Sequence, residues 1–166
     1  MPYAVANDNV RLYFEEAGQG TPIIFLHEFA ADHTNWEPQM RYFARGHRCI
    51  AYSARGYTPS DTPPSSEVYT YKHFYTDALA VLNHLKIPKA HFVGLSMGSY
   101  SSLQIGLNAP ERALSLTLAA VARARASKIW KPSASSARPM ANNMKRSALP
   151  KWPKRRARRR AGFRFC

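Results

Sequence analysis

The chain has 166 residues, enough for one domain of ordinary size, and its formal net charge of +14 is unevenly distributed. Residues 1–120 hold 9 of the 24 Lys and Arg residues and all 10 Asp and Glu residues, so the excess charge lies in residues 121–166. Cys49 and Cys166 form neither a disulfide framework nor a zinc motif, and no run approaches the ~18 apolar residues of a membrane span. Because residues 1–10 also lack the pattern of a signal peptide, we expect a cytoplasmic protein.

The first predicted elements alternate between strands and a helix. The segment VRLYFEEA at 10–17 has a β-rich composition, and the continuous apolar run TPIIFLHEF at 21–29 suits a strand that is covered on both faces. A short helical segment follows at 36–43, and HRCIAYSAR at 47–55 is again strand-like. The Pro- and Ser-rich stretch at 56–67 then predicts a loop.

The clearest helix is predicted at residues 70–86, where Thr70 is a suitable N-cap and Pro88 prevents continuation. Its apolar side chains recur at helical spacing and form one stripe: Tyr71, Phe74, Tyr75, Ala78, Leu79, Leu82 and Leu85. A strand at 90–95, a helix from Met97 to about Asn108 and a strand at 113–121 complete the pattern. Strands that alternate with helices at this spacing predict a mostly parallel α/β sheet.

Residues 94–98 read GLSMG and lie where the predicted strand ends and the next helix begins. Such a turn holds its serine, here Ser96, in a strained backbone conformation with the hydroxyl exposed above the sheet. Gly94 and Gly98 let the strand and the helix cross closely, and the helix N-terminus offers the Met97 N–H to a developing oxyanion. The pattern predicts a nucleophilic serine, and the competing interpretation is a Gly/Ser turn without chemistry.

At this point the chain resembles the α/β-hydrolase family over about residues 3–120. The resemblance rests on four segments: IIFLHEF at 23–29, ARGYTPSD at 54–61, the helix at 70–86 and GLSMG at 94–98. It implies an α/β-hydrolase-type, mostly parallel sheet truncated to about six strands. It also implies a serine hydrolase of small-molecule, ester-like (acyl) substrates that uses no cofactor and no metal.

The resemblance also assigns roles to single residues. Ser96 becomes the nucleophile, and the amides of Phe29 and Met97 become the two donors of the oxyanion hole. The chain departs from the family at Glu28, where most members have Gly, and at Ser53, where an Asp often precedes the Arg-Gly pair. Glu28 places a carboxylate near a site that is meant to stabilise negative charge.

A serine nucleophile needs a base, and the base needs an orienting acid. In this fold both follow the serine in the chain, yet no Asp and no His occurs after Ser96. The only later acid is Glu111, which precedes its strand and is expected at the end of the sheet away from the site. His27 is a candidate substitute base, but we favour a structural histidine that bonds loop backbone, as the family's equivalent histidine usually does. We therefore expect a catalytically incomplete enzyme.

Residues 122–166 lose all periodicity and are rich in Arg, Ala, Ser and Pro. We interpret residues 1–121 as a partial α/β-hydrolase domain and residues 122–166 as a disordered basic tail. The abrupt change is typical of a frameshift or a premature end that replaces the later part of the domain. The alternative is a genuine basic arm, a non-enzymatic binding segment in which KWPKRRARRR at 151–160 contacts nucleic acid or acidic lipid, without specificity for a nucleic acid sequence.

Overall fold

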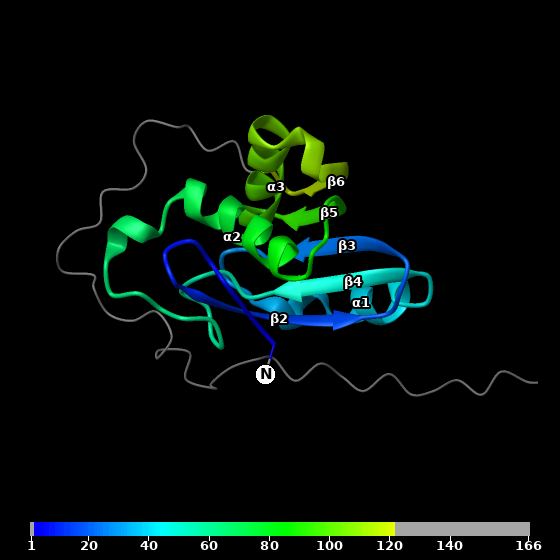
Figure 1. Cartoon of the computed structure of the whole chain (residues 1–166), viewed down its shortest axis with the longest axis horizontal. Coiled ribbons are helices and arrows are strands. Elements are labelled where there is room, and N and C mark those ends of the chain that lie inside the picture. The colour runs from blue at the N-terminus through cyan, green and yellow to red at the C-terminus, as the bar shows by residue number, and fades with distance from the viewer. Residues whose placement is uncertain (1, 122–166) are drawn as a thin grey trace, which may run out of the picture.

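Six strands form one twisted sheet in the computed structural model, which describes residues 2–121 (Figure 1). In chain order they are β1 (Tyr3–Val5), β2 (Arg11–Ala17), β3 (Thr21–Leu26), β4 (His47–Tyr52), β5 (Ala90–Leu95) and β6 (Ala113–Ala119). Their spatial order is β1-β2-β4-β3-β5-β6. The pairs β1–β2 and β2–β4 are antiparallel, whereas β4, β3, β5 and β6 run parallel. The prediction of a mostly parallel α/β sheet of about six strands is confirmed.

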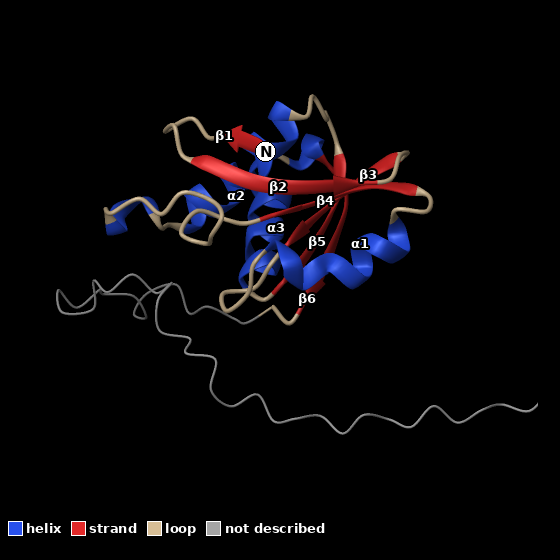
Figure 2. Ribbon diagram, turned by 90° about the horizontal axis from the view of Figure 1, so that it is seen from below, coloured by secondary structure: helices blue, strands red, loops and turns tan. Residues whose placement is uncertain are grey.

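Helices cover both faces of this sheet, with α2 and α3 on one side and α1 on the other (Figure 2). The helices are α1 (Glu37–Phe43), α2 (Tyr71–His84) and α3 (Met97–Asn108). Three short 3-10 turns also occur: η1 (His33–Trp36) before α1, η2 (Ser66–Val68) before α2 and η3 (Pro110–Arg112) after α3. The Thr70 side chain accepts a hydrogen bond from the His73 N–H, which caps α2 at the predicted position.

The two faces of β3 belong to two different apolar layers. Ile24 and Leu26 pack with the layer under α2, whereas Phe25 packs with Trp36 and Met40 under α1. Successive side chains of a strand point to opposite faces, so a strand covered on both sides needs an unbroken apolar run. The run IIFL meets that need and places β3 in the middle of the sheet, beside β4 and β5.

The observed strands differ from the expected ones at several ends, and the strand expected at 113–121 stops at Ala119. The sequence does not predict β1, a three-residue strand that pairs only with β2. The strands expected at 21–29 and 47–55 end earlier, at Leu26 and Tyr52, and the residues that follow form loops. These loops lie at the carboxyl edge of the parallel strands, where α/β folds place their ligand sites. The tail and basic-arm predictions lie outside the described residues.

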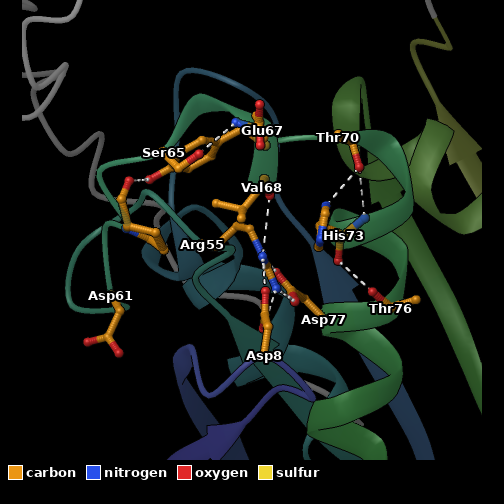
Figure 3. Close-up of polar contacts among 12 residues, drawn as sticks. Asp8, Arg55, Asp61, Ser65, Glu67, Val68, Thr70, His73, Thr76 and Asp77 are labelled. Atoms are coloured by element: carbon orange, nitrogen blue, oxygen red, sulfur yellow. Dashed lines mark hydrogen bonds and ion pairs between the residues drawn. The ribbon is translucent and has the colours of Figure 1, made fainter.

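A buried arginine ties three segments of the fold together (Figure 3). Arg55, which is 1% exposed, follows β4 and contacts Asp77 on α2 through two nitrogens, at 2.8 and 2.6 Å. It also contacts Asp8, in the β1–β2 loop, at 2.6 Å. Burial alone would lower the pKa of Arg55, but the two carboxylates outweigh it and raise that pKa. Separating Arg55 from Asp77 would leave a buried charge without its partner, which is costly. The ion pair therefore holds α2 in place against the sheet.

Candidate active site

Ser96 occupies the corner between β5 and α3, as the sequence predicts. Its backbone has φ 51° and ψ −108°, a left-handed conformation that an L-residue holds only when its surroundings impose it. The Ser96 N–H donates to the carbonyl of Ala119, at the end of β6, at 2.9 Å. The amide of Ser96 itself is therefore occupied, and the first amides of α3, which lack intrahelical acceptors, remain as donors beside the elbow.

The two glycines beside Ser96 are required by close backbone packing. A Cβ on Gly94 would overlap the carbonyl of Gly98, and a Cβ on Gly98 would overlap the carbonyl of Leu26, the last residue of β3. In both cases the obstacle is backbone, which cannot rotate aside as a side chain can. The elbow is thus pressed against the end of β3, and this contact brings the loop after β3 next to the start of α3.

The predicted oxyanion donors come from the two segments that meet at this contact. Met97 is the first residue of α3, so its N–H lacks an intrahelical acceptor. Phe29 lies in the loop that follows β3, and its side chain is 54% exposed. Glu28, the residue where the chain departs from its family, is half-buried, and its carbonyl accepts the Nδ1–H of His27 at 2.7 Å.

His27 is buried and uses both ring nitrogens. Its Nδ1 donates to the Glu28 carbonyl, and its Nε2 accepts the N–H of Ala54 at 3.0 Å. Burial lowers the pKa of this imidazole, which favours the neutral ring that these two bonds require. No lone pair remains to receive the proton of Ser96. The geometry therefore fits the favoured interpretation of His27, a histidine that organises loop backbone.

The buried histidine gives a testable pH dependence. Because the folded pKa of His27 lies below the ordinary value of about 6.5, the unfolded chain binds a proton more readily. The contribution of neutral His27 to the stability of the folded protein is complete above the ordinary pKa of about 6.5, and it is lost as the pH falls below that pKa. In urea unfolding between pH 7.5 and 5, we expect wild type to lose more stability than His27→Gln. Equal slopes for His27→Gln and wild type would contradict this.

The structure also assembles a serine, a histidine and a carboxylate that sequence reasoning does not connect. The Oγ of Ser53 lies 2.8 Å from Nδ1 of His33, and Nε2 of His33 lies 3.4 Å from Glu15 Oε1. Ser53 is fully buried, and its hydroxyl donates to the Thr58 carbonyl at 3.3 Å. A substrate cannot reach it, so this cluster fastens the loop after β4 to β2. A hollow of about 240 Å³ beside His33 does not include Ser96 among its lining residues.

Two further sequence expectations concern metal and membrane. Within residues 2–121, no three His, Cys, Asp or Glu side chains gather in a geometry that could hold a metal ion. None of the described helices is long and apolar enough to cross a membrane.

Glu111, the acid that follows Ser96 in the chain, lies in η3 at the start of β6. It therefore lies at the end of the parallel strands opposite to Ser96.

The family comparison agrees with the fold. The family model described as alpha/beta hydrolase fold matches residues 21–164, and the chain belongs to this family. The chain is 34% identical over 108 residues to 3-oxoadipate enol-lactonase 1 of Acinetobacter baylyi, covering 65% of this chain and 38% of that protein. It is 33% identical over 111 residues to an epoxide hydrolase of Caballeronia sordidicola, covering 66% of this chain and 34% of that protein.

Comparison with a solved structure also indicates the α/β-hydrolase fold. The described fold resembles an N-acyl homoserine lactone degrading enzyme with a TM-score of 0.65 and 35% identity, over 69% of this chain and 43% of that one. The chain thus spans well under half of the length of the relatives that it matches.

Proposed function

We propose that this chain carries the nucleophile and the oxyanion hole of a hydrolase that acts on esters or lactones. The observation that carries the proposal is the strained corner that holds Ser96, with the Met97 N–H at the adjacent helix start. In the reaction, Oγ of Ser96 attacks the substrate carbonyl carbon and loses its proton. The amides of Met97 and Phe29 stabilise the oxyanion until the alcohol leaves. Water then attacks the acyl-serine and releases the acid.

A serine nucleophile favours ester and lactone substrates over epoxides, the other class of substrate in the names of the relatives. Attack of a serine hydroxyl on an epoxide would form an ether with the enzyme, and water does not readily cleave an ether. Attack on an ester or a lactone forms an ester with Ser96, which water does cleave. The similarity to a lactonase and to a lactone-degrading enzyme therefore supports the proposal, whereas the similarity to an epoxide hydrolase supports only the fold.

We also propose that this hydrolysis of esters or lactones is slow. No Asp and no His follows Ser96 in the chain, and His27 has both nitrogens engaged. The proton of Ser96 must then pass to solvent, so the oxyanion hole and substrate binding act without a general base. In serine proteases that lack a triad member, these terms alone leave roughly 10³–10⁴-fold catalysis over water.

A Ser96→Ala variant tests the proposal. We expect wild type to hydrolyse p-nitrophenyl acetate slowly and to be labelled by a fluorophosphonate at Ser96. The variant should lose the label completely, because it lacks the attacking oxygen, and should hydrolyse the ester more slowly than wild type. Intact mass and peptide mapping identify the labelled residue. Ser115→Ala, an exposed serine on β6, is the matched control and should keep the wild-type rate. Equal rates for wild type and Ser96→Ala would refute the nucleophile assignment.

A further inference from the structure

Tyr57 lies in the loop after β4 and reaches both segments that carry the proposed oxyanion donors. Its hydroxyl donates to the carbonyl of Phe29 at 2.8 Å and lies 3.9 Å from Sδ of Met97. Its ring packs edge-to-face against the ring of His27, with 4.6 Å between the centroids. One side chain therefore contacts the loop after β3, the buried histidine beneath that loop and the start of α3.

The peptide groups on both sides of Phe29 are each fixed by one of these two rings. The N–H of Phe29 shares a rigid peptide plane with the carbonyl of Glu28, which accepts the Nδ1–H of His27. The carbonyl of Phe29 belongs to the next peptide plane, which the Tyr57 hydroxyl holds. With both planes fixed, the backbone angles of Phe29 are determined, and with them the direction of its N–H.

The backbone of Tyr57 is itself anchored close to the same histidine. Its N–H donates to the Ala54 carbonyl at 3.1 Å, and the N–H of Ala54 donates to Nε2 of His27. The preceding residue, Gly56, has φ 85° and donates its N–H to Asp61 at 2.9 Å. The ring therefore has little freedom to leave the Phe29 carbonyl.

We propose that Tyr57 is a positioning residue that orients the Phe29 amide as an oxyanion donor, an inference that rests on the proposed function. The hydroxyl acts as a hydrogen-bond donor and not as a proton-transfer group, because it is already committed to a backbone carbonyl. Burial raises the pKa of Tyr57 to about 12, so the hydroxyl stays protonated and able to donate throughout the neutral range.

Tyr57→Phe removes only the hydroxyl and keeps the ring against His27. We expect the Ser96-dependent hydrolysis of p-nitrophenyl acetate to fall by about tenfold, less than the roughly 10²–10³-fold loss of a whole oxyanion donor, because the Phe29 amide is misdirected and not removed. The thiono analogue of this ester develops its charge on sulfur, which accepts amide hydrogen bonds poorly, so its rate should change little. The ratio of oxo to thiono rates should therefore fall, which general destabilisation would not cause.

Tyr69→Phe is the matched control, since the Tyr69 hydroxyl also donates to a loop carbonyl, that of Pro63, at 2.7 Å. Its oxo-to-thiono ratio should equal that of wild type. Equal losses on both esters in Tyr57→Phe, or an unchanged oxo rate, would overturn the inference.

Amide hydrogen exchange separates this inference from the proposed function. In Tyr57→Phe the Ala31 amide, which donates to the Glu28 carbonyl at 3.3 Å, should exchange faster, whereas the amides of β5 keep their wild-type rates. If wild type and Ser96→Ala hydrolyse the ester equally, the proposed function fails and the exchange result alone decides whether Tyr57 orients this loop. Unchanged exchange at Ala31 would overturn the positioning role.

Discussion

Gly98→Ala should destabilise the protein by more than about 3 kcal/mol, although it adds a single methyl group to a helix. The new Cβ would overlap the backbone carbonyls of Leu26 and His27 at the end of β3. Relief requires α3 to move away from the sheet, and that movement separates the loop of Phe29 from the helix start. Urea unfolding monitored by circular dichroism gives the change in stability.

Gly106→Ala is a matched control because it places the same substitution on the same helix. There the new Cβ meets the end of the Leu116 side chain, which can rotate, and alanine favours the helix by about 1 kcal/mol over glycine. We expect a stability within about 1 kcal/mol of wild type. Gly98→Ala unfolding at the wild-type urea concentration would show that the contact with β3 is looser than the structure indicates.

Arg55→Met should cost about 3–5 kcal/mol of stability, because it leaves Asp77 fully buried without its cation. Arg11→Met is the comparison for an exposed pair: Arg11 contacts Asp61 at 2.9 Å at the surface, where solvent screens the attraction, and the expected loss of stability is small. A double variant, Arg55→Met with Asp77→Leu, should recover most of the loss, since the isolated charge is then gone. Equal losses for the two single Arg variants in urea unfolding would contradict this account.

The loss in Arg55→Met should also depend on pH. Burial raises the pKa of Asp77, and Arg55→Met removes the guanidinium whose hydrogen bond and charge oppose that effect. A carboxyl whose folded pKa exceeds its unfolded value of about 3.9 binds a proton more readily in the folded state, so stability rises as the pH falls. The gap between Arg55→Met and wild type should therefore narrow from pH 7 towards pH 4. A gap that widens over this range would place the destabilisation elsewhere.

Local backbone requirements explain which parts of the fold can be predicted from the sequence. The corner at Ser96 is encoded within five residues, because Gly94 and Gly98 are needed at fixed distances from the serine. The helix α2 is encoded by one apolar stripe, a cap at Thr70 and a proline beyond its end. The unbroken apolar run of β3 reflects its cover on both faces.

The remaining features depend on contacts between distant segments and leave no periodic signal. The strand β1 is too short for a pattern, and Arg55 finds its partners 22 and 47 residues away. Tyr57 acts on a backbone carbonyl 28 residues earlier, which no side-chain pattern can reveal. The roles of Ser96, Phe29 and Met97, and the division of the chain at residue 121, stay predictions.

The carbonyl of Ala119 links the nucleophile to the last strand of the described sheet. It accepts both the N–H of Ser96, at 2.9 Å, and the hydroxyl of Ser99, at 2.6 Å. Ser99 also lies 2.6 Å from the Gly94 carbonyl, so β5, β6 and the elbow meet at one buried hydroxyl. Thermodynamic linkage makes this contact reciprocal. A contact that restrains the end of β6 therefore stabilises the strained backbone of Ser96. In return, an acyl group bound at Ser96 stabilises the restrained end of β6, and the two coupling free energies are equal.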